Sequence, residues 1–410
     1  MTTQGYFDYN ATTPVCSEAV NAFINAVTQY ANPSSKYGLS KTSNEIINDA
    51  RAQVATLIGA DTGEVFFTSG GTESNNWAIK GAFFQQLKIS STRNHLIVSE
   101  MEHSSVLEVC AFLEREFDCT VTRLKPDSEG IVSVAAVANA LRPETLLVSV
   151  MMVNNEVGSL QPIRDIAALL DDRASQQKNL HDQKIHFHVD AVQAVGKIPV
   201  DVRDLGVDTM SFSGHKFYAP KGIGGLYIRQ GIKITPLLHG GGQERGLRGG
   251  TEAIASVAAM GAAAQVTVNT LNDQVVYLAK YRELLRSELL SVVPGVYFHG
   301  PANKALQAPN TLSVCIPGIR AEALAALLDN MHGIQVSLGA ACSNNKSVAL
   351  SHVLLSMGLD EDAVKATLRV SIGQYTTESD IHRFVQAVVT GVTTLFRISK
   401  PASQSYVTTA

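Results

Sequence analysis

The feature that most constrains the fold is a regular alternation of short apolar runs with helical patterns between residues 65 and 228. Nearly continuous apolar strands separated by amphipathic helices are typical of a mainly parallel sheet that helices cover on both faces. The runs occupy residues 65–68, 96–98, 146–153, 185–189, 209–212 and 225–228. We therefore predict an α/β fold in which this stretch forms the core of a large domain.

The length of the chain predicts a second domain. At 410 residues it exceeds what one hydrophobic core usually supports, and its 45% hydrophobic residues supply apolar surface for two. Residues 253–290 have few helix breakers, as expected of a long linker helix. We predict a large domain of residues 15–262 and a smaller α+β domain of residues 1–14 and 263–398. Residues 399–410, rich in Ser and Thr, are predicted to be a disordered tail.

Lys216 and Asp190 each follow one of the apolar runs. Because the two runs read as neighbouring strands, we expect both residues at one edge of the sheet. Pyridoxal phosphate needs such a pair: a lysine for a Schiff base, and a carboxylate that keeps the pyridine nitrogen protonated. Taken singly, they also suit a surface lysine and a helix-capping aspartate. Together, with Ser213 and His215 beside the lysine, they favour the cofactor.

The turn after the first run is a candidate phosphate site. Gly70, Gly71 and Thr72 lie between the predicted strand and a helical pattern that starts at Trp77. Small residues let the backbone approach a phosphate, and the amides at a helix N-terminus favour an anion. Many α/β proteins have such a turn for its geometry alone, and this one matches neither a Walker loop nor a GxGxxG fingerprint.

Short motifs run in one order through almost the whole chain: 7–14 (FDYNATTP), 68–76 (TSGGTESNN), 102–103 (EH), 153–158 (VNNEVG), 190–193 (DAVQ), 213–216 (SGHK), 239–245 (HGGGQER), 250–252 (GTE), 339–342 (GAAC) and 376–378 (TTE). With them the chain resembles the cysteine desulfurases of the class V aminotransferase superfamily, which have fold type I. The resemblance implies a mainly parallel sheet of the seven-stranded type in the large domain and a smaller domain that carries a catalytic cysteine loop.

The resemblance assigns cofactor contacts and substrate contacts to separate sets of residues. The residues implied to bind pyridoxal phosphate are Gly71, Thr72, His103, Asn155, Asp190, Gln193, Ser213, Gly214, His215, Lys216 and Thr251. The residues implied to bind the substrate are Asn32, Asn155 and Arg369. No resident metal ion is implied.

The resemblance also divides the chemistry among these residues. Lys216 would carry the cofactor, Asp190 would pair with its pyridine nitrogen, and His103 would stack on the ring and move protons. Thr251 would reach the phosphate bound by a partner subunit, which implies a homodimer. Arg369 would clamp the substrate carboxylate, for which its planar fork is better suited than a lysine. The alternative for Arg369 is an ordinary surface cation before a strand.

Cys342 separates sulfur chemistry from the lysine-only reactions of the superfamily. Small residues precede it and a polar run follows it at 343–347, so we expect a mobile loop. A mobile thiol can attack the sulfur of a bound substrate and then reach an acceptor. The resemblance implies conversion of L-cysteine to L-alanine, a persulfide on Cys342 and sulfur transfer to an unidentified acceptor protein, as in iron–sulfur cluster assembly. Cys342 could then transiently ligate a cluster held by that partner.

Departures from the family pattern leave other activities open. Lys36 follows the Asn-Pro-Ser-Ser run where relatives have a histidine, Gln374 stands where many have an arginine, and a polar insert occupies residues 172–184. A selenocysteine lyase is the first alternative, because residues 336–342, residues 353–356 and the polar insert also resemble those of selenocysteine lyases, which share the fold and the cofactor. A cysteine-independent lyase or aminotransferase is the second, and an inactive sulfur-relay scaffold is the third. The intact set of Lys216 and Cys342 with their neighbours argues against the scaffold.

The remaining composition excludes several classes of partner. A net charge of −4 with mixed signs gives no basic footprint for nucleic acid. No apolar run approaches the ~20 residues of a membrane span, and the N-terminus lacks a targeting pattern. Cys16, Cys110 and Cys315 are expected to be packing residues, and Cys119 a strand-edge residue. An odd total of five cysteines argues against a disulfide framework, so we expect a cytoplasmic enzyme in a reducing compartment.

Overall fold

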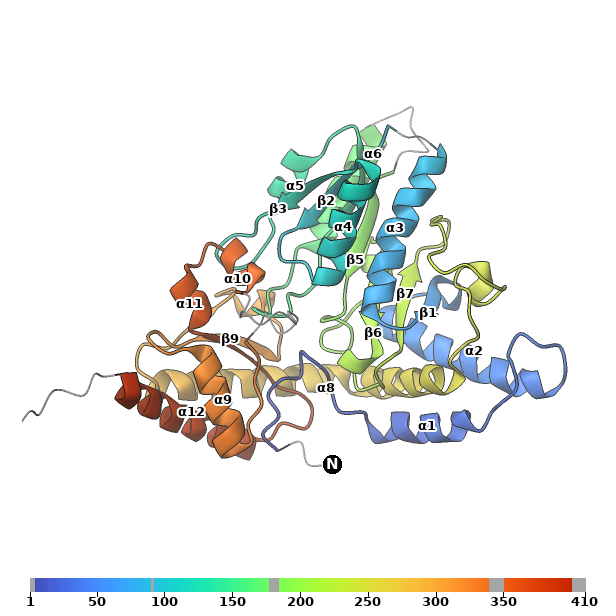
Figure 1. The fold of residues 1–410 in the computed structure, drawn as a ribbon. Helices are drawn as coiled ribbons and strands as arrows, with labels where there is room; N and C mark the ends of the chain where they lie inside the picture. Colours follow the sequence, from blue (N-terminus) through green and yellow to red (C-terminus); the bar gives the residue numbers. More distant parts are fainter. Residues whose placement is uncertain (1–3, 90–91, 177–183, 339–349, 400–410) are drawn as a thin grey trace, which may run out of the picture.

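The computed structural model describes residues 4–89, 92–176, 184–338 and 350–399 (Figure 1). The helices within these ranges are α1 (Ser17–Val27), α2 (Leu39–Ile58), α3 (Gly71–Ile89), α4 (Ser104–Phe117), α5 (Val134–Ala140), α6 (Ile163–Gln176), α7 (Val202–Leu205), α8 (Ile254–Val292), α9 (Ala321–His332), α10 (His352–Ser356), α11 (Glu361–Lys365) and α12 (Glu378–Ser399). Single 3-10 turns occupy η1 (Thr62–Glu64), η2 (Gly214–Lys216), η3 (Glu244–Gly246) and η4 (Lys304–Leu306).

A seven-stranded sheet forms the larger part of the fold. Its strands are β1 (Val65–Thr68), β2 (His95–Ser99), β3 (Thr120–Leu124), β4 (Thr145–Ser149), β5 (His186–Asp190), β6 (Thr209–Ser213) and β7 (Gly224–Ile228), in the order β1-β7-β6-β5-β4-β2-β3. The central pairs are parallel, and β7 alone runs antiparallel to both of its neighbours. The prediction of a mainly parallel α/β sheet is confirmed.

Both faces of this sheet are buried under helices. Leu96 and Val98 of β2 lie in a cluster with side chains of α3 and α4, whereas Ile97 between them lies in a cluster with α2, α6 and α8. Successive side chains of a strand point to opposite faces, so a strand buried on both sides has to be apolar throughout. This requirement is why the runs in the sequence are continuous rather than alternating.

Helix α3 begins six residues before the Trp77 start that the apolar pattern indicated. Its first turns hold small and polar residues, and two of them, Ser74 and Asn75, are buried and hydrogen-bonded. A buried face made of polar residues carries no hydrophobic period, so the pattern misses it. Gly71 therefore lies within the first turn of the helix rather than in a loop before it.

A second, antiparallel sheet has the order β10-β9-β8, with β8 (Tyr297–His299), β9 (Thr311–Cys315) and β10 (Thr367–Ser371). Helices α9 and α12 contribute Leu324, Leu328 and Phe384 to the hydrophobic cluster beside it. The N-terminal segment joins the two parts of the fold, because Phe7 lies in this cluster and Tyr9 lies in the cluster of the large sheet. A bridge pairs Asp8 with Ser371 at the end of β10.

Helix α8 runs beneath both sheets (Figure 1). Within the described ranges it is the one helix long and apolar enough, by length and composition, to cross a membrane, which the sequence did not lead us to expect. Its side chains explain the composition: Met260 and Ala263 belong to the core of the large sheet, and Leu278 and Leu285 to the second core. These contacts are those of a core helix. Because α8 continues unbroken through residue 262, the predicted domain boundary there stays a prediction.

Candidate active site

A cavity of about 390 Å³ lies where β5 and β6 end. Asp190 is the last residue of β5, and Lys216 closes the turn η2 that follows β6. Because β5 and β6 are parallel neighbours, their ends meet at one edge of the sheet, as the sequence predicted. The residues that line the cavity are Asn10, Ala11, Gly71, Thr72, Asn75, His103, Ser105, Met151, Asn155, Asp190, Val192, Gln193, Ser213, His215, Lys216 and Arg369.

Lys216 is anchored by the N-terminal segment. Its Nζ donates to the carbonyl oxygens of Asn10 at 2.6 Å and Ala11 at 2.7 Å. Gly214 provides the room for the turn, because a Cβ there would meet Ala219 and Ile223 at 3.1 Å. The lysine is half-buried and so remains accessible from the cavity.

Asp190 is held by a chain of buried polar side chains. Its Oδ2 accepts from Asn75 Nδ2 at 2.7 Å, and its Oδ1 accepts from the amide of Val192 at 2.9 Å. On the other side of Asn75, Oδ1 lies 3.0 Å from Nε2 of His188. Burial lowers the pKa of His188 to about 3, so this imidazole is neutral and must carry its proton on Nε2 to donate to Asn75. His188 thereby fixes which end of the Asn75 amide faces Asp190.

His103 caps the N-terminus of α4 from the cavity wall. Its Nδ1 accepts from the amide of Ser105 at 3.1 Å, and Ser105 Oγ lies 2.8 Å away. Burial lowers the pKa of His103, an effect that Lys216 adds to and Asp190 opposes. Since Nδ1 is an acceptor, the neutral ring carries its proton on Nε2. The Asn75 amide also donates to Ser105 Oγ at 2.8 Å, which links His103 to Asp190.

The glycine turn brings bare backbone to the cavity. Gly71 is the first residue of α3, and a Cβ on it would lie 2.7 Å from Cγ2 of Val192. Thr72, Ser213 and His215 line the same cavity. Burial lowers the pKa of His215 to about 4, with Lys216 adding to the effect, so this ring is a neutral hydrogen-bonding group. Free amides at a helix start beside neutral donors suit an anion.

Arg369 is a buried residue in the middle of β10, so the alternative of a surface cation before a strand is wrong. Its Nη2 donates to Asp8 at 2.8 Å and its Nη1 to the carbonyl of Asn155 at 3.3 Å. Its buried Nε has no hydrogen-bond partner among the described residues. A guanidinium that is 5% exposed and keeps unused donor capacity beside a cavity is placed to receive a carboxylate.

Some residues assigned from the sequence do not line this cavity. Asn32 is exposed, and its Oδ1 accepts from the amide of Ser34 at 2.9 Å. Thr251 is exposed in the segment before α8. Cys342 lies outside the described residues. The other predicted cofactor and substrate residues line the cavity, apart from Gly214, which supports the turn beneath Lys216.

Sequence reasoning gave no role to three residues of the cavity or its floor, Asn10, Asn75 and Lys197. Asn75 carried a detectable signal, since it lies four residues before the buried Ile79 on the inward face of α3. A polar residue at a buried helical position needs a partner, and here the partners belong to the site. Asn10 and Lys197 gave no such signal, because their contacts join segments more than 180 residues apart.

The four cysteines in the described part of the chain are buried, and none of them forms a disulfide. Cys110 lies in α4, Cys315 in β9 and Cys16 directly before α1, which confirms the packing prediction for these three. Burial raises the pKa of Cys16 and Cys110, and that of Cys119 to about 12. These three groups are thiols at neutral pH and are poor nucleophiles.

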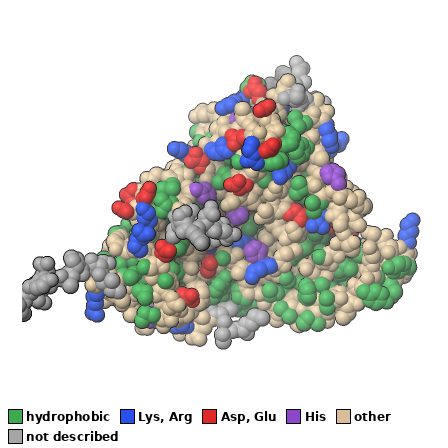
Figure 2. All heavy atoms as spheres, viewed as in Figure 1, with side chains coloured by type: hydrophobic (Ala, Val, Ile, Leu, Met, Phe, Trp, Pro, Cys, Tyr) green, Lys and Arg blue, Asp and Glu red, His purple; other side chains and the backbone are tan. Residues whose placement is uncertain are grey.

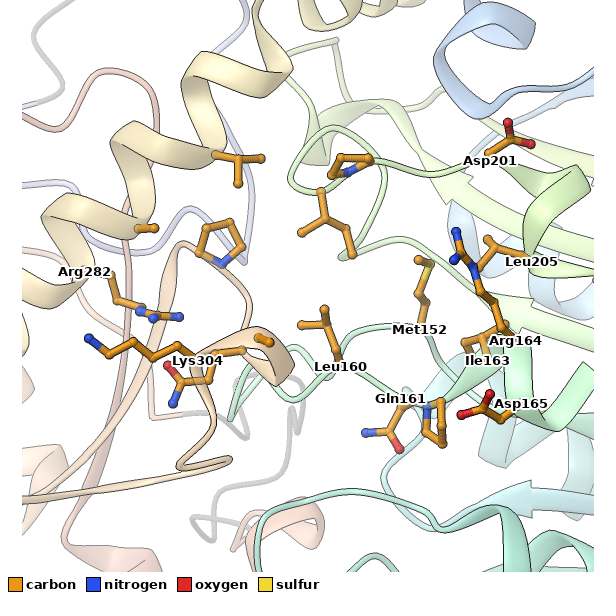
Figure 3. A pocket seen from close by; sticks show the side chains of 18 of the residues that line it. Met152, Leu160, Gln161, Ile163, Arg164, Asp165, Asp201, Leu205, Arg282 and Lys304 are labelled. Atoms are coloured by element: carbon orange, nitrogen blue, oxygen red, sulfur yellow. The ribbon is translucent and has the colours of Figure 1, made fainter.

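A larger cavity of about 620 Å³ lies apart from the predicted residues, between the loop after β4 and helix α8. Its middle is apolar, with Met152 and Leu160 among its walls. Figure 3 shows Arg282 and Lys304 at one side of it, and Arg164, Asp165 and Asp201 at the other. Arg282 is already bonded to the carbonyl of Ala308 at 2.6 Å. The cavity lacks the convergent reactive groups of the smaller one.

Comparisons with known proteins agree with this geometry. The model of the family described as aminotransferase class-V matches residues 5–384. "Cysteine desulfurase IscS" of Clostridium botulinum (strain Hall) is 41% identical, with 93% of this chain and 92% of that protein covered. "Cysteine desulfurase IscS" of Methanosarcina thermophila is 40% identical, with 98% and 95% covered.

Solved structures share the fold as well. The chain described as "NIFS-LIKE PROTEIN" is 35% identical with a TM-score of 0.86, and the match covers 96% of this chain and all of that one. The structure described as "SspA in complex with cysteine" is 34% identical with a TM-score of 0.76, and covers 91% of this chain and all of that one.

Proposed function

This chain belongs to the aminotransferase class-V family and, within it, to the cysteine desulfurases; from that premise we propose that it uses bound pyridoxal phosphate to take sulfur from L-cysteine and release L-alanine. The observation that carries the proposal is the meeting of Lys216, Asp190 and Arg369 in one cavity. An amine, a buried carboxylate and a buried guanidinium are the groups that this cofactor and an amino-acid substrate require.

The residues present fit the cofactor. Asp190 offers a carboxylate held by two donors, and Lys216 offers a half-buried amine. There is no space for a side chain at Gly71. Its backbone lies at the start of α3 and lines the cavity, where backbone amides suit a phosphate. When bound, pyridoxal phosphate supplies a carbonyl carbon that bonds to amines and a protonated ring that withdraws electrons from the substrate Cα.

The chain supplies the proton transfers and the orientation. Arg369 binds the carboxylate of the substrate, and Asn155 lies next to it through its carbonyl. Lys216 takes the proton from Cα and returns one, since it is the basic side chain closing the cavity floor. Asp190, fixed by Asn75, would hold a proton on the pyridine nitrogen of the bound cofactor. His103, neutral and protonated on Nε2, moves protons at the wall.

The sulfur step is proposed for Cys342. Its thiolate forms an S–S bond to the substrate sulfur while the substrate Cβ–S bond breaks, and the electron pair of that bond stays on the carbon side. Protonation of the carbon then gives alanine, and Cys342 keeps a persulfide. The net change converts L-cysteine and the Cys342 thiol into L-alanine and a Cys342 persulfide. The outer sulfur of the persulfide then passes to an acceptor protein that is still unidentified. The predicted cytoplasmic location stays a prediction.

The proposal predicts a coloured protein with a reducible bond. Purified protein saturated with pyridoxal phosphate should show a visible absorption band that borohydride bleaches, and peptide mass spectrometry should find the cofactor on Lys216. Amino-acid analysis should find alanine formed from L-cysteine. The exposed Lys221 provides the matched control, because Lys221→Ala should change neither result. A wild-type protein that binds no pyridoxal phosphate at saturation would refute the proposal.

We also propose a homodimer in which each subunit completes the other's site. The exposed positions of Thr251 and Asn32 outside the cavity support this, since both were assigned to the site by family resemblance. An exposed apolar surface on α1 and the following loop also supports it: Ile24 is 57%, Val27 58% and Tyr30 86% exposed. Figure 2 shows apolar side chains gathered at the lower right, where α1 and α2 lie in Figure 1. Such surfaces mark interaction sites.

Light scattering of the cofactor-bound protein should therefore give twice the chain mass of 43.9 kDa. The double variant Ile24→Asp/Val27→Asp should dissociate the dimer, because two carboxylates would have to be buried against an apolar surface of the other subunit. Dissociation should also weaken cofactor retention. Val276→Asp is the matched control, since Val276 is 70% exposed on α8 and is not one of the residues that define this surface. A wild-type protein that stays monomeric at micromolar concentration would rule the dimer out.

A further inference from the structure

Glu73 is a charged residue beside the proposed phosphate site that the proposed reaction does not use. It follows Thr72 in the first turn of α3, and its side chain is 11% exposed. Its carboxylate reaches back beyond the start of the helix, where Oε2 accepts from the amide of Ser69 at 2.8 Å. Burial alone would raise the pKa of Glu73, but hydrogen bonds from Arg248 and Ser69 lower it below its ordinary value. A negative charge therefore lies at the end of α3 that is proposed to receive a phosphate.

Arg248 binds this carboxylate through two parallel hydrogen bonds. Its Nε donates to Glu73 Oε1 at 2.8 Å, and its Nη2 donates to Oε2 at 3.1 Å. The arginine side chain is 21% exposed, so water screens the pair only in part. A bidentate contact fixes both the position and the direction of a carboxylate. The Glu73 carboxylate is thereby held on Ser69 and Arg248, away from the amides at the start of α3 that have no partner within the helix.

The glycine-rich segment that carries Arg248 is itself fixed. Glu244, four residues earlier, is buried and accepts from Arg51 at 2.8 and 2.9 Å. Gly249, the next residue, packs so closely on Gly240 that a Cβ on it would lie 2.7 Å from the Gly240 nitrogen. These two contacts flank Arg248 in the sequence, so the fold determines where its guanidinium lies.

The groups that face the proposed phosphate site are neutral. They are the backbone at Gly71 and the side chains of Thr72, Ser213 and His215, and burial lowers the pKa of His215 to about 4. Their attraction for an anion comes from N–H and O–H dipoles and from the N-terminus of α3, which is equivalent to about half a positive charge. An uncompensated carboxylate in the first turn of α3 would cancel much of this attraction.

We propose that Arg248 is a positioning residue of the phosphate site, which neutralises Glu73 and holds its carboxylate away from the amides that receive the cofactor phosphate. The inference rests on the proposed function, because it takes this turn as the phosphate site. Arg248 needs no contact with the cofactor, since it acts through Glu73. The affinity for phosphate should therefore depend on the balance of the two charges and not on the arginine alone.

The test compares pyridoxal phosphate with pyridoxal, which has the same aldehyde and lacks the phosphate. Absorbance titrations of the cofactor-free protein give a dissociation constant for each. Arg248→Met should weaken binding of pyridoxal phosphate about tenfold, as expected of one unpaired charge near an anion in a partly buried site, and leave pyridoxal unchanged. Glu73→Gln should bind pyridoxal phosphate at least as tightly as wild type, because it removes the repelling charge. The double variant Glu73→Gln/Arg248→Met should recover most of the loss.

Arg203→Met is the matched control, because it removes one positive charge from an exposed ion pair with Asp61 outside the cavity. It should change neither dissociation constant. Near-UV circular dichroism checks that each variant is folded. If Arg248→Met folds poorly, Glu73→Gln decides the question, since weaker binding of pyridoxal phosphate by that folded variant contradicts repulsion by Glu73.

Equal weakening of pyridoxal and pyridoxal phosphate in Arg248→Met would indicate a purely structural role and overturn the inference. A double variant that binds pyridoxal phosphate as weakly as Arg248→Met would overturn it as well.

Failure of the proposed function is a separate outcome, which a titration with inorganic phosphate followed by phosphorus NMR distinguishes. This titration needs no reactive lysine, so it still reports the turn in a protein that never bonds to pyridoxal phosphate. Arg248→Met should weaken binding of inorganic phosphate about tenfold. Equal binding by wild type and variant, or no binding by wild type, would contradict the inference.

Discussion

Lys216→Ala is expected to reduce alanine formation from L-cysteine by roughly 10³-fold or more. The substitution removes the side chain that is proposed both to bond to the cofactor and to move the Cα proton. It also leaves the Asn10 and Ala11 carbonyls without the donor that they share at 2.6 and 2.7 Å. Amino-acid analysis of alanine under saturating cofactor measures the loss directly.

Cofactor binding separates the two roles of this lysine. The phosphate and ring contacts remain in Lys216→Ala, so the variant should still retain added pyridoxal phosphate without a borohydride-stable bond to the protein. Small primary amines added to the buffer should restore part of the activity, because they can take over the proton transfer that the missing lysine side chain performed. A variant that keeps more than about a tenth of wild-type turnover would mean that another residue moves the proton.

Cys342→Ala is expected to abolish L-cysteine desulfuration while leaving substrate binding intact. The thiol is the proposed recipient of sulfur, whereas Arg369 and Lys216 are the residues proposed to bind and activate the substrate. Removing the thiol should therefore block cleavage of the substrate Cβ–S bond and leave the earlier steps in place. Absorbance changes on adding L-cysteine should persist and alanine should not appear. In wild type, mass spectrometry after one turnover should find one added sulfur atom on the Cys342 peptide.

Selenocysteine is the control substrate for this variant. Selenium leaves carbon more readily than sulfur and does not always need an attacking thiol, so Cys342→Ala should keep part of its selenocysteine turnover. Full desulfuration by Cys342→Ala would favour a thiol-independent lyase. Wild-type protein that acts on selenocysteine and is inert toward cysteine would favour a selenocysteine lyase.

The large sheet and the pairing of Lys216 with Asp190 were predictable, because both depend on local patterns. A strand buried on two faces reads as an apolar run, and the residue after it lies at the sheet edge. β5 and β6 obey this rule, so their neighbouring ends followed from order alone. The antiparallel direction of β7 could not be predicted, since a run of five buried residues looks the same whether the strand is parallel or antiparallel to its neighbours.

The supporting residues of the site were not predictable in the same way. Asn10 and Lys197 are polar residues in two separate turns, and nothing near them in sequence indicates that they touch. The start of α3 was missed because its inward face is polar. Asn32 and Thr251 came from family resemblance, which names residues but not the subunit whose cavity they reach. The roles of the site residues stay predictions until the variants above are measured.

The N-terminal segment has a consequence for how the protein is made. The backbone N–H of Asn10 donates to Ser371 Oγ at 2.9 Å, and Asp8 forms an ion pair with Arg369. The floor of the cavity therefore joins residues about 360 positions apart in the sequence. On the ribosome, the large sheet can fold as it emerges, yet Lys216 cannot acquire its anchored setting until β10 has left the exit tunnel. The complete cavity therefore forms only near the end of synthesis of the chain. A chain released early would hold Lys216 without Arg369, the residue proposed to bind the substrate carboxylate.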